Sequence, residues 1–291
     1  LYNDALEIYK RIGRTRGIIE AHQMIGKVYR NQGKYDKATT EFETSLQLSE
    51  EHSLFLFKAD ALTGLGIVFK EQGEYQKAIE YFNQTLKTAQ HIGDKFREEK
   101  NLGNMGLVYQ NLGQYENAIT HFKEAIKIAT QIGNKRGEGI NLGSIGIVYN
   151  KIGQYENAIA HYKESIEIAR QIGDKRSEGQ NLGSLGNVYY HLGQYEKAIQ
   201  YYKEAIEITS RIGDKGFLSI AVRQLGVTYL HLGRYVESIE KYQEAIAILR
   251  GSEHHHDRSV TLENLGNVHT ILGEYTQAQQ HYTDALAIAE S

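Results

Sequence analysis

The sequence contains no cysteine and no proline, and its 33 basic residues nearly balance 36 acidic ones. Without cysteine the chain has no disulfide framework, no thiolate metal site and no cysteine nucleophile. A net charge of −3 gives no general attraction to nucleic acid or to anionic membranes. No apolar run approaches the roughly 20 residues that a membrane-spanning helix needs, and no signal peptide is visible. We therefore expect a cytoplasmic chain with no nucleic-acid and no membrane partner.

Glycine, in contrast, is plentiful, and its positions recur at a step of 40 residues. Seven glycines mark this period: Gly33, Gly73, Gly113, Gly153, Gly193, Gly233 and Gly273. A tyrosine follows each of them two residues later, and a small residue and then an aromatic residue follow in the same register, beginning with Tyr35, Ala38 and Phe42. A fixed period of roughly 20 to 50 residues is typical of a solenoid or repeat array.

One copy of the repeat, residues 174–213, shows how each copy is expected to fold. Asp174 is a suitable N-cap, because its carboxylate can accept a hydrogen bond from a free N–H of the first helical turn. Apolar residues then recur at helical spacing until Gly193, which ends the helix in the left-handed conformation. A second helix starts near Tyr195 and ends at Gly213. Every copy therefore predicts a pair of helices of about 16–18 residues and no strand.

A second series of glycines lies inside the first helix of each copy, and Gly186 is one of them. A glycine within a helix costs about 1 kcal/mol relative to alanine, so its recurrence requires a packing reason. We expect the second helix to approach closely here, with Ala198 facing Gly186.

The residues with fixed spacing form one motif: Leu182, Leu185, Gly186, Tyr189, Ala198 and Tyr202. This motif resembles the tetratricopeptide repeat (TPR) pattern over the whole chain. Leucine replaces the frequent tryptophan, the terminal proline is missing, and the period exceeds the usual 34 or so residues. The longer form resembles Pins-type G-protein signalling adaptors, kinesin light chains and bacterial, especially cyanobacterial, TPR proteins. The resemblance implies an all-α fold, an α-solenoid of helix-turn-helix repeats that forms a right-handed superhelix with the first helices on the concave side.

The expected organisation is a single TPR array over residues 1–291. It starts with a partial helix at residues 1–12 and continues as seven repeats: 14–53, 54–93, 94–133, 134–173, 174–213, 214–253 and 254–291. Both ends fall inside the repeat pattern, so we expect a larger parent protein.

Two links between repeats depart from the pattern, at residues 54–57 and 251–257. Leu54 to Phe57 are four consecutive apolar residues, which are seldom fully exposed without a purpose. We expect this link to deviate from regular stacking or to bury its phenylalanines.

Chemistry-bearing residues do not gather in a catalytic pattern. His254, His255 and His256 are adjacent, but consecutive helical residues point about 100° apart, so the three would rarely face one ion. No base and nucleophile are paired by position. We therefore expect no catalytic, cofactor-binding or metal site, and a chain that is not an enzyme.

The face implied to be concave varies between repeats, whereas the packing positions stay constant. Its middle combines glycine with apolar residues and its ends are polar, which suits an amphipathic helix or an extended peptide. The candidate groove residues are Lys27, Arg30, Lys100, Asn104, Leu107, Ile140, Gly143, Ile147, Gly183, Asn187, Arg223, Val227, Glu263, Asn264 and Asn267. An alternative is that the central glycines only reflect recent duplication of nearly identical repeats.

We expect this chain to be a protein- or peptide-binding adaptor or scaffold domain of a larger signalling or assembly protein. The alternative is a structural module that self-associates through open solenoid ends.

Overall fold

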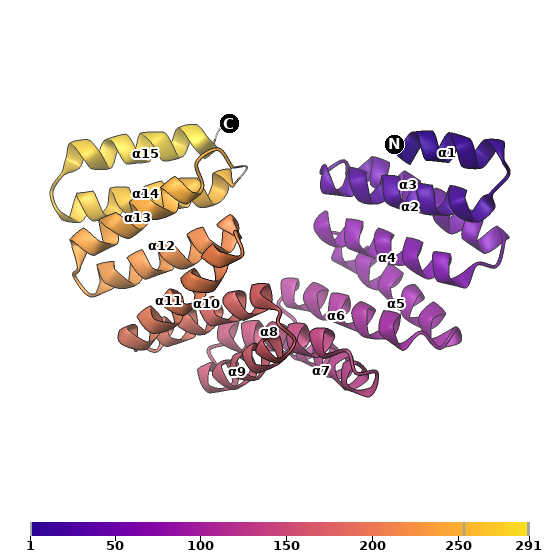
Figure 1. Cartoon of the computed structure of the whole chain (residues 1–291), viewed down its shortest axis with the longest axis horizontal. Coiled ribbons are helices and arrows are strands. Elements are labelled where there is room, and N and C mark those ends of the chain that lie inside the picture. Colours follow the sequence, from indigo (N-terminus) through magenta and orange to yellow (C-terminus); the bar gives the residue numbers. More distant parts are fainter. Residues whose placement is uncertain (1, 253, 290–291) are drawn as a thin grey trace. The chain divides into compact units, whose positions relative to one another are not determined.

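The computed structural model describes residues 2–252 and 254–289, and within them the chain forms helices and short links without a strand (Figure 1). In chain order the helices are α1 (Tyr2–Arg11), α2 (Thr15–Asn31), α3 (Tyr35–Glu51), α4 (Phe55–Glu71), α5 (Tyr75–His91), α6 (Lys95–Asn111), α7 (Tyr115–Gln131), α8 (Lys135–Lys151), α9 (Tyr155–Gln171), α10 (Lys175–His191), α11 (Tyr195–Arg211), α12 (Lys215–His231), α13 (Tyr235–Ile248), α14 (His255–Ile271) and α15 (Tyr275–Ala289). The fold is an all-α solenoid of helical repeats, as the sequence predicts.

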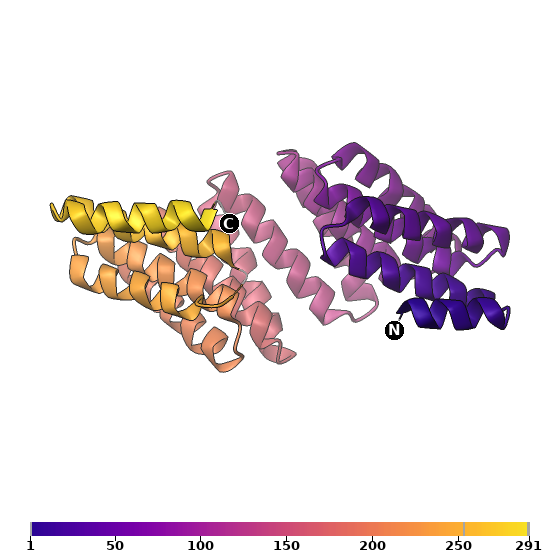
Figure 2. The same cartoon turned by 90° about the horizontal axis from the view of Figure 1, so that it is seen from above.

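The chain divides into two compact parts, residues 1–148 and residues 149–291. Within each part successive helices pair as hairpins, for example α2 with α3 and α6 with α7 in the first part, and α10 with α11 in the second (Figure 2). The first helices of neighbouring hairpins also touch, as α2 does with α4 and α12 with α14. Each hairpin is therefore stabilised by its neighbours along the chain.

Helix α10 begins and ends with the geometry that the sequence predicts. Gly193 has a φ of 69°, and the backbone N–H of Gln194 donates to the carbonyl of Tyr189 at 2.9 Å. At the start of α10 the Asp174 carboxylate accepts a hydrogen bond from the backbone N–H of Ser177 at 3.1 Å. The expected glycine stop and aspartate N-cap are thus confirmed.

The prediction for the Leu54–Phe57 link was wrong, because this link is an ordinary one. Helix α4 starts at Phe55, as the other first helices start after their links. Ser53 takes the position of the usual glycine with a φ of 53°, and the backbone N–H of Leu54 donates to the carbonyl of Ser49 at 2.8 Å. Phe55 remains 43% exposed, with its ring edge against His91 at 5.1 Å between centroids. An aromatic neighbour on α5 partly covers the ring, so the link needs no special geometry.

The other irregular link, residues 251–257, includes residue 253, which lies outside the described residues. Helix α13 before it has 14 residues, whereas the corresponding helix α11 has 17. Gly251, with a φ of 73°, lies between α13 and α14.

In six of the hairpins an aromatic ring packs directly onto the mid-helix glycine. A Cβ atom at Gly186 would lie 2.7 Å from Cε1 of Tyr202. The same contact recurs in other hairpins between Gly26 and Phe42, Gly66 and Phe82, Gly106 and Phe122, Gly226 and Tyr242, and Gly266 and Tyr282. Ala198 is fully buried, yet the nearest atoms to Gly186 belong to Tyr202, so the expected pairing with Ala198 was wrong. The Tyr202 ring is long enough to reach Gly186 across the space between the two helices, whereas the methyl group of Ala198 is not.

Replacing Gly186 with alanine should destabilise the protein by about 1–3 kcal/mol, because overpacking against the Tyr202 ring outweighs the gain of about 1 kcal/mol in helix propensity. Gly183 in the same helix is the matched control, since a Cβ atom there would meet only Ala205, at 3.9 Å. Gly183→Ala should stabilise by up to about 1 kcal/mol. Urea unfolding measures both, and equal midpoints would contradict this packing.

Candidate functional site

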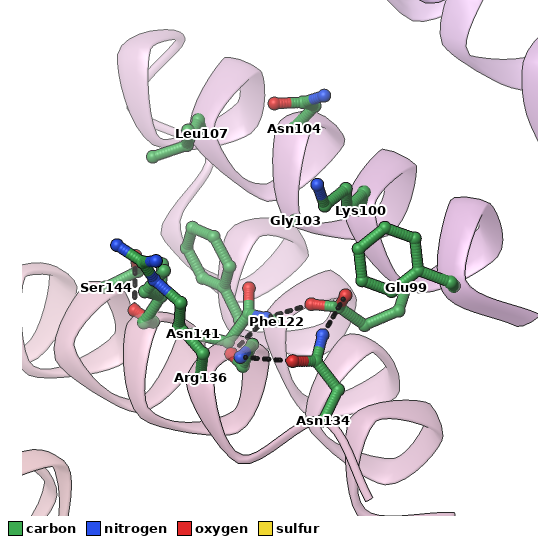
Figure 3. A pocket seen from close by; sticks show the side chains of 13 residues that line it. Glu99, Lys100, Gly103, Asn104, Leu107, Phe122, Asn134, Arg136, Asn141 and Ser144 are labelled. Carbon is green, nitrogen blue, oxygen red and sulfur yellow. Dashed lines mark hydrogen bonds between the residues drawn. The ribbon is translucent and has the colours of Figure 1, made fainter. Parts of the chain in front are cut away.

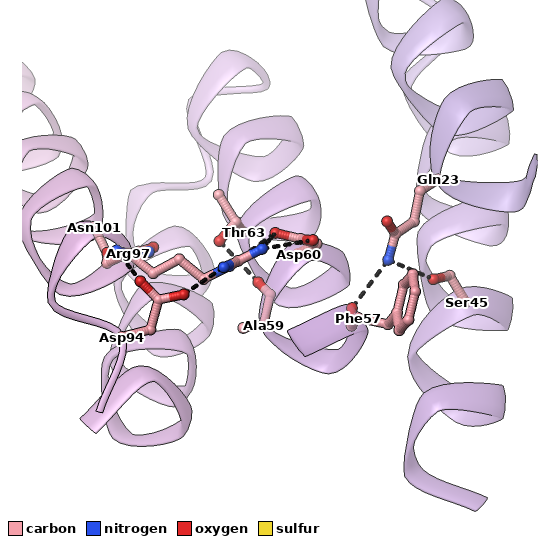
Figure 4. A network of polar contacts seen from close by, with 9 residues as sticks. All are labelled: Gln23, Ser45, Phe57, Ala59, Asp60, Thr63, Asp94, Arg97 and Asn101. Atoms are coloured by element: carbon pink, nitrogen blue, oxygen red, sulfur yellow. Dashed lines mark hydrogen bonds and ion pairs between the residues drawn. The ribbon is translucent and has the colours of Figure 1, made fainter. Parts of the chain in front are cut away.

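Polar side chains connect the first helices of neighbouring hairpins in residues 1–148 (Figure 4). The Gln23 amide of α2 donates to the Ser45 hydroxyl at 3.0 Å and to the carbonyl of Phe57 at 2.9 Å. Arg97 of α6 donates to both carboxylate oxygens of Asp60 in α4, at 2.9–3.0 Å. These contacts differ from repeat to repeat, so polar chemistry varies on an apolar scaffold that stays the same.

The next step along the chain, from α6 to α8, leaves a pocket of about 480 Å³ (Figure 3). Its wall contains aromatic, aliphatic, charged and amide side chains. The lining residues are Phe96, Glu99, Lys100, Gly103, Asn104, Leu107, Phe122, Asn134, Arg136, Gly137, Ile140, Asn141 and Ser144. Pockets of roughly 300–1,000 Å³ with a mainly apolar wall and a few polar groups are typical of ligand sites.

A carboxylate lies buried in this pocket. Glu99 of α6 is only 3% exposed, and its carboxylate points toward the amides of Asn134 and Asn141 (Figure 3). The amide nitrogen of Asn141 donates to Oε1 at 2.9 Å, and that of Asn134 donates to Oε2 at 3.0 Å. Burial raises the pKa of Glu99, and the two amide hydrogen bonds and the nearby charge of Lys100 offset only part of that effect.

The amides that hold Glu99 are themselves fixed. The side-chain oxygen of Asn134, the residue before α8, accepts from the backbone N–H of Gly137 at 3.1 Å, which leaves its nitrogen to face Glu99. The Asn141 nitrogen also donates to the carbonyl of Gly137 at 2.8 Å. Aspartate occupies the place of Asn134 in three other repeats, as Asp94, Asp174 and Asp214, and a second carboxylate here would repel Glu99.

Two glycines provide the space for this cluster. A Cβ atom at Gly137 would lie 2.7 Å from Oε1 of Glu99, and one at Gly103 would lie 2.9 Å from the side-chain oxygen of Asn141. Both side chains are held by hydrogen bonds, so neither can move aside freely. The sequence therefore builds one cluster from Glu99, Gly103, Asn134, Gly137 and Asn141.

A second buried glutamate shows what Glu99 lacks. Glu178 of α10 is 4% exposed and accepts from Arg170 at 2.8 Å and from Lys175 at 2.7 Å. Burial acts to raise its pKa, but these two cations bring the pKa below its usual value. Among the residues that the structure describes, no cation lies within ion-pair distance of Glu99.

Four of the sequence-predicted groove residues meet in this pocket: Lys100, Asn104, Leu107 and Ile140. Ile140 is 50% exposed, and Leu107 is half-buried. The Lys100 ammonium lies 4.3 Å from the centroid of the Phe96 ring, so it is directed to an aromatic face and not to Glu99.

The other predicted residues do not line the pocket: Lys27, Arg30, Gly143, Ile147, Gly183, Asn187, Arg223, Val227, Glu263, Asn264 and Asn267. Gly143 is buried. Two of the asparagines are already bonded within their own hairpins. The side-chain oxygen of Asn187 accepts from the Tyr202 hydroxyl at 2.7 Å, and that of Asn267 accepts from the Tyr282 hydroxyl at 2.7 Å.

Sequence reasoning missed Phe96, Glu99, Asn134, Arg136 and Asn141 as pocket residues. One signal was present for Glu99, because the other repeats carry an aliphatic or small residue at its position. Those residues are Ile19, Ala59, Gly139, Gly179, Ser219 and Ser259. A single glutamate at a position that is otherwise aliphatic or small does not serve packing, and therefore indicates a role in binding.

The described part of the chain holds no group of three or more His, Cys, Asp or Glu side chains that could bind a metal ion. None of its helices is both long enough and apolar enough to cross a membrane.

Comparisons with known proteins agree with this architecture. The family model described as tetratricopeptide repeat matches residues 18–91, 98–171, 140–211, 177–250 and 216–291. No curated protein matches the sequence significantly.

Solved structures share the fold at low sequence identity. A signal transduction ATPase with a tetratricopeptide repeat sensor from Pyrococcus horikoshii is 20% identical over 97% of this chain and 44% of its own, with a TM-score of 0.77. Aspartyl phosphate phosphatase F from Bacillus subtilis is 19% identical over 98% of this chain and 74% of its own, with a TM-score of 0.72. The Rap conjugation gene regulator of plasmid pLS20, solved with a bound Phr peptide, is 16% identical over 94% of this chain and 74% of its own, with a TM-score of 0.63.

Because the pKa of Glu99 is raised, we expect its removal to increase the stability of the fold, by an amount that depends on pH. A carboxyl with a raised folded-state pKa contributes stability below its ordinary value of 4.5, and that contribution is lost as the pH rises through the raised pKa. Relative to wild type, Glu99→Ala should therefore become more stable as the pH rises from about 4 to about 8.

Glu178→Ala is the control of opposite sign, because the pKa of Glu178 is lowered. This variant should lose stability at neutral pH, and the loss should shrink as the pH falls through the lowered pKa. Urea unfolding at a series of pH values measures both differences. If the stability of wild type and that of Glu99→Ala changed with pH in parallel, the raised pKa of Glu99 would be contradicted.

Proposed function

Since the chain belongs to the tetratricopeptide repeat family, we propose that it is a protein- or peptide-binding adaptor or scaffold domain that holds its ligand along the first helices of the solenoid. It acts as part of a larger cytoplasmic signalling or assembly protein, and it binds without catalysing a reaction. One observation carries the proposal: the open pocket between α6 and α8, which the packing of the hairpins leaves unfilled.

The pocket has the features of a peptide anchor site. Ile140 and Leu107 expose apolar surface beside Gly103, where a partner backbone can come close. The amide of Asn104 can donate to and accept from a peptide backbone. Affinity in such sites usually rests on a few central anchors that fill a pocket. A fold relative solved with a bound Phr peptide supports this use of the fold.

Self-assembly is the second candidate, and one surface favours it. Leu286 on α15 is 59% exposed, whereas its counterpart Ile246 on α13 packs against Leu265 and Val268 of α14. The exposed face of α15 thus offers the surface on which another helical repeat can stack, and a second copy of this chain supplies one. Sedimentation velocity over a range of concentrations tests this candidate, with Leu286→Glu expected to abolish any association.

Peptide binding is tested with Ile140→Glu. A charged side chain in the apolar wall should weaken the binding of a selected peptide by about 2 kcal/mol or more, which raises its Kd about 30-fold. Ile271→Glu is the matched control, because Ile271 is a similarly exposed isoleucine at the end of α14, where the corresponding residue of α4 is Glu71.

Peptides are selected from a random displayed library on the wild-type protein, and their Kd is measured by fluorescence anisotropy. The melting temperature of each variant controls for folding. Selected peptides that bind Ile140→Glu and wild type equally would place the binding surface elsewhere.

A further inference from the structure

The pocket between α6 and α8 contains a carboxyl group that forms no ion pair with any residue the structure describes. Glu99 is buried, and its carboxylate receives hydrogen bonds from two neutral amides. Buried ionised groups in proteins are normally paired with an opposite charge, because leaving water is costly for a lone ion. Glu178, which is equally buried, follows this rule with Arg170 and Lys175.

The Glu99 carboxylate still has room for a further donor. An ionised carboxylate offers about four acceptor positions on its two oxygens. The amides of Asn141 and Asn134 occupy one position on each oxygen. Since Glu99 lines the pocket, a donor that enters from the pocket can reach the remaining positions.

We propose that Glu99 is the counter-ion for one basic side chain of the peptide ligand, a lysine or an arginine that enters the pocket between α6 and α8. This inference rests on the proposed peptide-binding function and specifies the ligand that the site selects. A basic side chain brings both the donors and the charge that the buried carboxylate lacks.

The walls of the pocket suit the apolar part of a lysine or arginine side chain. Both side chains carry a long apolar stem that packs on aliphatic and aromatic surfaces. In this pocket those surfaces come from Leu107, Ile140 and Phe122. The Phe96 ring already attracts a cation, because the Lys100 ammonium lies 4.3 Å from its centroid. The pocket lining therefore offers an entering guanidinium or ammonium group an aromatic face as well as the carboxylate of Glu99.

Lys100 also sets a limit on the ligand. It lines the pocket, is exposed and carries a positive charge. A second basic residue beside the first would be repelled there, whereas an acidic neighbour would be attracted. The pocket therefore selects a single basic residue and not a polybasic segment.

Glu99, Asn134 and Gly137 each differ from the residues at the same positions in the neighbouring repeats, which fits a built site. The position of Glu99 is aliphatic or small in the other repeats, and the asparagine and glycine that accommodate it come from the start of the next repeat. With aspartate in place of Asn134 or a larger residue in place of Gly137, the carboxylate would meet a like charge or lose its space.

The test starts with random peptides displayed against the whole wild-type chain. Enriched peptides should share one basic position. Replacing that residue with glutamine in the peptide, and making Glu99→Ala in the protein, should each weaken binding by about tenfold or more. Making both changes together should cost little more than either alone, because the two groups act as a pair.

Glu98→Gln is the matched control. Glu98 is a buried carboxylate on the same helix, but it pairs with Lys95 at 2.9 Å and does not line the pocket. This variant should keep the wild-type affinity and the wild-type preference for a basic residue. Circular dichroism melts show whether each variant is folded.

Two outcomes separate this inference from the function on which it rests. Enriched peptides without a common basic residue, or peptides whose affinity survives Glu99→Ala, would overturn the role of Glu99 and leave peptide binding intact. Failure of the wild-type chain to enrich any peptide would overturn the proposed function itself, and the role of Glu99 with it.

Discussion

The contact between an aromatic ring and a mid-helix glycine sets the geometry of every hairpin in which it occurs. In one hairpin it joins Gly186 to Tyr202, and in another it joins Gly106 to Phe122. The glycine lowers helix propensity, but it allows a large ring to pack between two helix backbones, and burial of an aromatic side chain is among the largest apolar contributions to a core. Because the ring cannot slide along the helix, the contact also fixes the register of the two helices.

A scaffold fixed in this way leaves the faces between neighbouring first helices free to vary. At one step Gln23 joins α2 to α4, and at the next Arg97 joins α4 to α6 through Asp60. At the step from α6 to α8 the partner of Glu99 is a pair of amides, and a pocket remains beside them. The same backbone arrangement thus carries a neutral contact, an ion pair and an open site.

The sequence predicted the helices and their ends, because these depend on short-range features such as the Asp174 cap and the turn at Gly193. It did not predict the partner of Gly186, since periodicity places a residue on a face without saying how far its side chain reaches. The Leu54–Phe57 link was misread because apolar composition alone does not show that Ser53 can adopt the left-handed turn.

The site was harder to predict than the fold. The sequence named four of the residues that line the pocket, because they lie on the variable face of a first helix: Lys100, Asn104, Leu107 and Ile140. The environment of Glu99 depends on amides that lie 35 and 42 residues further along the chain, which only the packing of two repeats brings together.

The ring-on-glycine contact has a consequence for how such a chain changes over time. Phe122 both packs on Gly106 and lines the pocket, but the hydrogen-bonded cluster of Glu99, Asn134 and Asn141 consists of residues that take no part in the ring-on-glycine contacts. Substitutions in that cluster therefore leave the ring contacts of the hairpins unchanged. Recognition can drift while the architecture is conserved. A duplicated repeat already contains the residues that pack its hairpin, while the exposed face of its first helix can still change. A long array can therefore acquire different binding sites in successive repeats.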